Sequence, residues 1–258
     1  MSRYSQNFYD SVSNRAIQSA QTAANVIFCS IVPNSLIDIG SGQGVWLRSF
    51  SKKFETVSRT VALDLQPHES SFFDELRQSG TNFEFIEVDF EISSKLPEEN
   101  FDIAICLEVL EHLTTETAIE VAKEIGRKCS LVIFSAAITG QGGTGHINER
   151  KFSYWMDLMR SQGFVVLDVF RPALGKSQDV PGYYKQNMVL CWHPKNARKN
   201  GTKFDLEALL EGNTLEVRDN RSYVSRIRYA LVALIPTWVV TGLVKILDKT
   251  IRKSNQQQ

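Results

Sequence analysis

The stretch Ser35-Leu-Ile-Asp-Ile-Gly-Ser-Gly-Gln-Gly-Val-Trp-Leu-Arg-Ser-Phe50 decides the fold. It opens with the apolar run 36–39, which predicts a buried strand. Glycines follow at positions 40, 42 and 44, and the residues after them predict a helix. Glycines at this spacing let the backbone turn tightly and bring main-chain N–H groups against a ligand. The stretch therefore predicts a ligand-binding turn between a strand and a helix.

The spacing of the glycines separates two classes of ligand. A dinucleotide-binding turn reads G-x-G-x-x-G and would place its third glycine at position 45, which is Val45 here. The pattern is instead D-x-G-x-G-x-G, beginning at Asp38, whose carboxylate would repel a pyrophosphate and attract an ammonium group. This pattern resembles the first motif of class I S-adenosylmethionine-dependent methyltransferases. The resemblance implies S-adenosylmethionine as the cofactor, bound by Asp38, Gly40, Ser41, Gly42 and Gly44.

Acidic residues also follow the next three predicted strands. Asp64 follows the run 61–63, Asp89 follows 83–88, and Glu108 follows 101–107. In doubly wound folds a carboxylate after the second strand holds the ribose hydroxyls, which is the role predicted for Asp64. The methyltransferase resemblance covers roughly residues 36–192. It implies that Asp89 binds the adenine amino group and that Phe90 packs on the adenine ring. It also places Leu65 and Glu108 at the cofactor.

The order of the predicted elements indicates an α/β fold. Strands are predicted at 35–39, 58–64, 83–88, 101–106, 130–136, 164–170 and 186–192, and helices at 44–54, 69–79, 115–128 and 150–161. This alternation predicts a doubly wound, mostly parallel seven-stranded sheet of the Rossmann-like methyltransferase type. The resemblance implies that the last strand, 187–192, runs antiparallel at the sheet edge. We expect three parts: a helical segment 1–34, a donor-binding domain 35–193 and a C-terminal extension 194–258.

Composition predicts a cytoplasmic enzyme with an unevenly charged chain. Residues 1–193 carry 17 Lys and Arg against 23 Asp and Glu, whereas residues 194–258 carry 12 against 6. No two of the four cysteines form a C-x-x-C pair, and the polar start of the chain does not resemble a signal peptide. The basic extension predicts a negatively charged partner, and the acidic body argues against nucleic acid.

The C-terminal extension contains the most unusual segment. Residues 194–201 are polar and basic and predict a linker, and 203–213 predict a short helix. Residues 229–244 then carry no charge and are flanked by basic residues on both sides. We expect an apolar helix at 229–247 and a peripheral contact with an anionic membrane through 226–253, on its cytoplasmic face. A helix packed on the body and a membrane span are the competing interpretations.

A glycine-rich segment, 139–149, follows the fifth predicted strand of the sheet and contains His146. Methyl transfer to a hydroxyl needs a base within hydrogen-bond reach, and His146 is the candidate. A histidine that only orders its loop is the plainer interpretation. The segment and the nearby aromatic residues resemble methyltransferases of bacterial cell-surface saccharide clusters. That resemblance implies O-methylation of a sugar hydroxyl or another polar small molecule, with a lipid-linked acceptor fitting the membrane contact.

Three alternatives stay open. Glu108, Glu111, His112 and His146 resemble the Mg²⁺ or Mn²⁺ ligand set of small-RNA 2′-O-methyltransferases, although the same string occurs in metal-free relatives. We therefore predict no metal. An NAD-type oxidoreductase is disfavoured by Val45. A non-catalytic, membrane-associated binding module is the third alternative. The intact donor site argues against it, because such a module would not need one.

Overall fold

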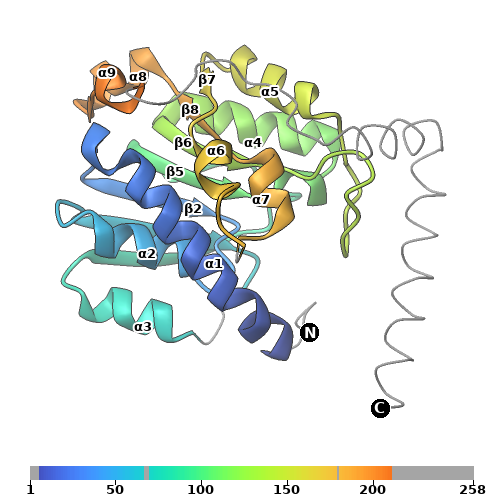
Figure 1. Ribbon diagram of the computed structural model, residues 1–258, viewed down its shortest axis with the longest axis horizontal. Coiled ribbons are helices and arrows are strands. Elements are labelled where there is room, and N and C mark those ends of the chain that lie inside the picture. The colour runs from blue at the N-terminus through green and yellow to red at the C-terminus, as the bar shows by residue number, and fades with distance from the viewer. Residues whose placement is uncertain (1–5, 67–69, 179, 211–258) are drawn as a thin grey trace.

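A seven-stranded sheet lies at the centre of the structure, between two layers of helices (Figure 1). The computed structural model describes residues 6–66, 70–178 and 180–210. The strand order is β4-β3-β2-β5-β6-β8-β7. The strands are β2 (Ser35–Ile39), β3 (Arg59–Asp64), β4 (Asn82–Glu87), β5 (Phe101–Leu107), β6 (Cys129–Ser135), β7 (Val165–Leu167) and β8 (Val189–Trp192). The first five are parallel, which confirms the predicted doubly wound, mostly parallel fold.

Helices cover both faces of the sheet because the central strands are apolar on both sides. On β5, Ile103 and Ile105 belong to one core cluster, whereas Ala104 and Cys106 belong to the other. Continuous apolar runs of this kind are typical of buried parallel strands. The first cluster includes residues of α1 (Gln6–Ile27), α2 (Val45–Lys53), α3 (Ser71–Gln78), α6 (Phe170–Leu174) and α7 (Gly182–Asn187). The second includes residues of α4 (Thr115–Lys128) and α5 (Phe152–Ser161).

The strand order fixes where a ligand would bind. The chain leaves β2 toward β3 on one side, and β5 lies on the other side of β2, so the order reverses between β2 and β5. In open α/β sheets, ligands bind outside the carboxyl ends of the strands at such a switch point. The glycine turn after β2 and the residues after β5 lie at that point.

The prediction for the last strand is half right. β8 runs antiparallel to β6, as expected, but it also pairs with β7 and therefore lies inside the sheet. β7 is the edge strand and is only three residues long, because α6 begins at Phe170. Asn187 ends helix α7 and does not belong to the strand. The predicted strands 164–170 and 186–192 were both too long for this reason.

The predicted linker at 194–201 is wrong. Pro194–Asn200 forms helix α8, with Pro194 in its first turn, and His193 caps the helix by accepting a hydrogen bond from the Asn196 N–H. The Asn196 amide donates to the carbonyls of Gly126 and Cys129, which attaches this helix to the body. Next, β9 (Lys203–Phe204) pairs with β1 (Ile31–Val32), and the short helix α9 covers Leu206–Leu210. The domain boundary at 193 stays a prediction.

The apolar helix predicted at 229–247 and its basic flanks lie outside the described residues. Within the parts of the chain that the structure does describe, no helix combines the length and the apolar character needed to cross a bilayer.

Candidate active site

The glycine turn is tied to the neighbouring strand and leaves open space at only one of its glycines. The N–H groups of Gly40 and Ser41 both donate to the Leu63 carbonyl of β3. A Cβ at Gly40 would meet Val109, and one at Gly44 would overlap the Phe73 ring, so these two positions are filled by the protein's own side chains. Gly42 has a φ of +52°, and no atom of the residues that the structure describes lies within 4 Å of the position that its Cβ would take. Among these three glycines, the open space in the described structure therefore lies at Gly42, and ligand binding there stays a prediction.

Asp64 holds this turn in place from the end of β3. Its Oδ2 accepts a hydrogen bond of 2.6 Å from the Gly42 N–H, and its Oδ1 accepts one of 2.7 Å from the Leu65 N–H. Each carboxylate oxygen keeps a second lone pair for a ligand hydroxyl. The Leu65 side chain is 55% exposed, which makes it an apolar rim beside the turn.

Asp38 is the buried acid of the site. Only 3% of the residue is exposed, and its Oδ2 has no hydrogen-bond partner within the described chain. Burial, together with the nearby Asp64 carboxylate, raises the pKa of Asp38 to about 8, although the Leu47 backbone N–H acts in the opposite direction. The Ser41 hydroxyl is also buried without a partner. A buried carboxylate oxygen and a hydroxyl that lack partners fit the ammonium end of the predicted donor.

Asp89 and Phe90 form the turn after β4. The Oδ1 of Asp89 accepts a hydrogen bond from the Glu91 N–H, and its carbonyl accepts from Ile92 and Ser93. The Phe90 ring is buried in the second core cluster. The turn lies at the same edge of the sheet as Asp64, because β3 and β4 are parallel. Its predicted contact with adenine stays a prediction.

Glu108 lies in a strained backbone conformation after β5. It is the only described residue other than glycine with a positive φ, at 56°. Its Oε2 accepts a 2.6 Å hydrogen bond from the Gln141 amide, whose oxygen accepts one of 2.7 Å from Asn187. Burial raises the pKa of Glu108. Strained residues concentrate at functional sites. The sequence analysis missed Gln141 and Asn187, which link the loop after β6 to α7.

Two tyrosines of α7 extend this side of the site. The rings of Tyr183 and Tyr184 lie 4.5 Å apart, and Tyr184 packs edge-on against Trp46 of α2 at 5.2 Å. Burial first, and then the Glu108 carboxylate, raises the pKa of Tyr183 to about 12, against the opposing effect of Arg15 on α1. Helix α7 is therefore linked to Glu108 both through the Asn187–Gln141 hydrogen bond and through the electrostatic effect on Tyr183.

His146 is held by a carboxylate that the sequence analysis did not single out. Its Nδ1 lies 2.9 Å from Oε1 of Glu149, and Glu149 also accepts hydrogen bonds of 2.7 Å from the N–H groups of Gly140 and Gly142. A Cβ at Gly143 would overlap the imidazole, so this glycine makes room for the ring. The glycine-rich segment is thus folded around Glu149 and fixes the orientation of His146.

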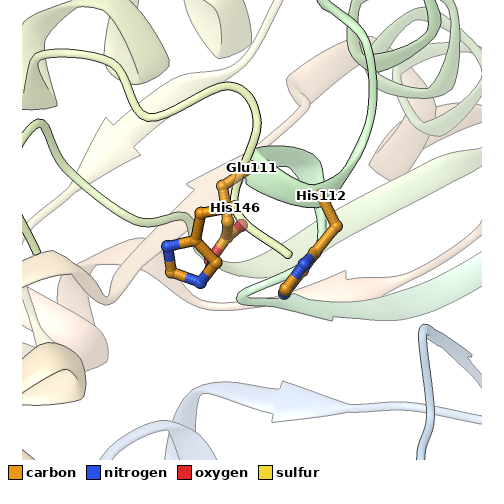
Figure 2. Close-up of side chains that lie close together, drawn as sticks. All are labelled: Glu111, His112 and His146. Atoms are coloured by element: carbon orange, nitrogen blue, oxygen red, sulfur yellow. The ribbon is translucent and has the colours of Figure 1, made fainter. Parts of the chain in front are cut away.

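His146 lies beside Glu111 and His112 of the short 3-10 helix Leu110–His112 (Figure 2). The His146 Nε2 is 3.9 Å from Oε1 of Glu111, and the two imidazole rings are 4.8 Å apart. One ligand atom from each of the three residues lies within 4.8 Å of the others. Burial, followed by the Glu108 carboxylate, raises the pKa of Glu111 well above its usual range. The three side chains could together hold a proton or a metal ion.

The predicted site residues lie at the carboxyl ends of strands β2 to β6 or in the segments that follow them, at one edge of the sheet. Electrostatic effects connect them: the Asp64 carboxylate acts on Asp38, and both His146 and Gln141 act on Glu108. Val109, the residue after Glu108, lies against Gly40, so the donor turn and the segment after β5 are neighbours. Glu149 could have been found from its position three residues after His146, a spacing that suits a carboxylate paired with an imidazole.

Residues 36–130 match the family model described as a methyltransferase domain. No curated protein sequence gives a significant match. The matched range contains every residue predicted to bind the donor. It also favours the methyltransferase interpretation over the NAD-type oxidoreductase.

Solved structures share the fold at low identity. A candidate O-methyltransferase from Nostoc punctiforme PCC 73102 is 14% identical with a TM-score of 0.54, over 72% of this chain and 58% of that chain. The small RNA methyltransferase HEN1 is 16% identical with a TM-score of 0.51, over 67% of this chain and 24% of that chain. LaPhzM is 17% identical with a TM-score of 0.50, over 72% of this chain and 57% of that chain.

At these identities the likeness concerns the fold, and this chain spans just over half of the length of LaPhzM. The family match adds that residues 36–130 are similar to a methyltransferase domain, which supports S-adenosylmethionine as the cofactor.

Proposed function

We propose that the protein is an S-adenosylmethionine-dependent O-methyltransferase whose acceptor is a hydroxyl of a sugar or another polar small molecule. One observation supports the acceptor chemistry most directly. An imidazole, that of His146, is held by Glu149 at the same edge of the sheet as the donor turn. Its side chain is 10% exposed, so it can meet a ligand without being open to bulk water.

The residues of the donor site bind S-adenosylmethionine and fix its orientation. The ammonium group of the donor pairs with the buried Asp38 carboxylate, and its ribose hydroxyls bind the Asp64 carboxylate beside Gly42. Asp89 and Phe90 receive the adenine, and Leu65 and Glu108 complete the cofactor contacts. S-adenosylmethionine supplies an electrophilic methyl group on a sulfonium. Holding donor and acceptor in line provides most of the rate enhancement for such a displacement.

The acceptor hydroxyl must lose a proton as the methyl group arrives. The carbon–sulfur bond breaks, a carbon–oxygen bond forms, and the sulfonium becomes the neutral thioether of S-adenosylhomocysteine. In the metal-free protein, Nε2 of His146 takes the proton, because Glu149 accepts the hydrogen bond of Nδ1–H and leaves the Nε2 lone pair available.

The test is turnover of labelled donor in the presence of fractionated polar metabolites, read as S-adenosylhomocysteine and as labelled product by mass spectrometry. With EDTA-treated protein, His146→Ala should lower turnover about 100-fold while the affinity for S-adenosylhomocysteine is kept. Added imidazole should restore part of the activity. Product labelled on nitrogen or carbon, or an unchanged rate in the variant, would contradict the proposal.

A lipid-linked saccharide is the acceptor class that the basic C-terminal extension favours. Residues 194–258 carry twice as many basic as acidic side chains, and each basic group near an anionic leaflet gains about 1 kcal/mol. We propose that 226–253 brings the enzyme to the cytoplasmic face of a membrane. Full-length protein should sediment with anionic vesicles and be released by high salt. Protein cut after Asn213 should remain in solution, and equal behaviour of the two forms would refute the contact.

A further inference from the structure

We propose that Glu111, His112 and His146 form a binding site for one divalent transition-metal ion. The inference deepens the proposed function and rests on it for its catalytic consequence, although cation binding itself can be tested without turnover. It concerns a cluster that joins the 3-10 helix after β5 to the loop after β6 (Figure 2).

Glu111 is the observation that points to a cation. The residue is completely buried, and neither of its carboxylate oxygens has a hydrogen-bond partner within the described chain. A buried carboxylate without partners is costly, and buried charges are normally paired or coordinate metals. A second carboxylate, that of Glu108, lies close enough to act on Glu111 and adds negative charge to the same place. Two carboxylates therefore share one buried place beside two imidazoles.

The imidazoles supply ligand atoms of the right kind, and their positions are fixed. The Glu111 carbonyl accepts hydrogen bonds of 2.9 and 3.0 Å from the N–H groups of Ile147 and Asn148, which locks the His146 loop against the helix that carries Glu111. Glu149 accepts the hydrogen bond of His146 Nδ1 and thereby turns Nε2 toward Glu111. A carboxylate bound to the far nitrogen of an imidazole is the usual outer partner of a metal-ligating histidine.

The ligand set selects among cations. Two imidazole nitrogens and one carboxylate suit Mn²⁺, Co²⁺ or Zn²⁺ better than Mg²⁺ or Ca²⁺, which prefer oxygen ligands. The ligand atoms lie within 4.8 Å of one another. In tetrahedral coordination, ligand atoms at about 2.1 Å from an ion lie roughly 3.4 Å apart, so the three side chains would have to move together by about 1 Å when an ion binds. Three protein ligands would leave room for an acceptor oxygen.

The consequence concerns the acceptor proton. A cation lowers the pKa of a hydroxyl bound to it, so the hydroxyl can lose its proton without the Nε2 lone pair of His146. His146 is then a ligand in the loaded protein, and the base role described above is confined to the metal-free protein.

Direct binding of Mn²⁺ to the full-length, EDTA-treated protein tests the site. Isothermal titration calorimetry and Mn²⁺ electron paramagnetic resonance should both report about one bound ion per chain. Glu111→Gln should lower the affinity at least 100-fold and remain folded, because the amide fills the same space without a charge. Absence of binding to the wild-type chain, or equal affinity in Glu111→Gln, would overturn the proposal.

Two further variants separate ligation from general effects on charge. Glu116→Gln changes the same residue type at an exposed position five residues along the chain and should bind Mn²⁺ like wild type. Glu149→Gln should weaken binding by about 10- to 100-fold, the usual effect of losing an outer-shell partner. If Glu116→Gln loses as much affinity as Glu111→Gln, the ion is held by surface charge and the site is wrong.

Failure of the proposed cation site can be distinguished from failure of the proposed methyltransferase function. S-adenosylhomocysteine binding, measured on the same EDTA-treated protein, reports on the donor site alone. Donor binding and turnover without Mn²⁺ binding would overturn only the cation site. Mn²⁺ binding without donor binding would overturn the methyltransferase proposal and leave the cation site standing.

Discussion

The Oδ2 of Asp64 lies 2.6 Å from the backbone nitrogen of Gly42, a residue 22 positions earlier in the chain. This bond joins the end of β3 to the one glycine of the turn that faces open space. Asp64 therefore acts in two ways. It shapes the turn, and its remaining lone pairs are available to a ribose. A variant at Gly42 tests whether the donor occupies the open space there. A variant at Asp64 tests whether the donor forms hydrogen bonds with its carboxylate.

Gly42→Ala should abolish donor binding while the protein stays folded. The added methyl group meets no atom of the described residues, so the expected cost to stability is the strain of a left-handed backbone conformation. Gly80→Ala is a matched control, since Gly80 also has a positive φ and no described atom within 4 Å of its Cβ position, but it lies two residues after the end of helix α3. Calorimetry with S-adenosylhomocysteine and a thermal melt should show equal loss of stability in both variants and loss of binding in Gly42→Ala alone. Normal binding by Gly42→Ala would place the donor elsewhere.

Asp64→Ala should weaken donor binding by about 1–3 kcal/mol, the scale of a charged hydrogen bond left unmade. The variant also removes the acceptor of the Gly42 and Leu65 N–H groups, so part of the loss comes from a less ordered turn. Asp64→Asn keeps an acceptor for one of these groups and should lose less. Dissociation constants for S-adenosylhomocysteine measure both effects. An alanine variant that binds as tightly as wild type would remove Asp64 from the ribose site.

The elevated pKa of Asp38 predicts how the donor-free protein responds to pH. Its pKa is raised from 3.8 to about 8 on folding, so the folded state holds the proton more tightly than the unfolded chain. The free energy of unfolding should therefore fall as pH rises from about 4 to 8. Asp38→Asn should melt at a higher temperature than wild type at pH 7.5, and this difference should shrink toward pH 4. A difference that is independent of pH would contradict the burial of an ionisable Asp38.

Donor binding should release a proton from Asp38. The ammonium group of the donor favours the ionised carboxylate, and at pH 6.5 that ammonium group itself stays protonated, because α-amino groups titrate near pH 7.7–8.0. Calorimetric titrations with S-adenosylhomocysteine at pH 6.5, in two buffers with different ionisation enthalpies, should differ by up to about one proton per site. Equal binding enthalpies in the two buffers would mean that Asp38 does not pair with the ligand.

Strands and helices that are indicated by the apolar pattern of their own residues could be predicted from the sequence. The central strands β2 and β5 are mainly apolar runs with one aspartate each, because both of their faces are buried, and α4 was predicted with the same bounds that the structure shows. β7 and β8 were predicted too long, because Val169 and Phe170 beside β7 and Met188 beside β8 extend the apolar pattern of each strand, although α6 begins at Phe170 and α7 ends at Asn187. Helix α8 was missed because tertiary bonds from Asn196 stabilise it, and no periodic pattern in residues 194–201 reveals them.

The candidate site was predictable where it depends on strand ends. Asp38, Asp64, Asp89 and Glu108 could be placed at one edge because parallel strands share that edge. The spacing of His146 and Glu149 suits a pair, but the fold of the loop around Glu149 could not be predicted, because that loop closes through backbone N–H groups that any residue carries. The unpartnered carboxylate of Glu111 is likewise a property of packing.

The last prediction concerns the boundary placed at residue 193. Asp102, at the start of β5, accepts hydrogen bonds from the N–H groups of Asn34 and Ser35 and from the hydroxyl of Thr202. The Thr202 hydroxyl also forms a hydrogen bond with the Ser130 hydroxyl of β6. The segment after α8 is therefore part of a hydrogen-bond network at the amino ends of β5 and β6. Protein ending at residue 193 should therefore melt at a lower temperature than protein ending at residue 210.

A double-mutant cycle locates the cause. Asp102→Ala should cost about 1–3 kcal/mol in the longer protein, because it leaves buried donors without an acceptor, and Thr202→Val should cost less. The two changes should not be additive, since the residues share a bond. In the protein ending at residue 193 the Asp102 change should cost less, because Thr202 is already gone. Equal melting temperatures of the two lengths would instead support a domain that ends at 193.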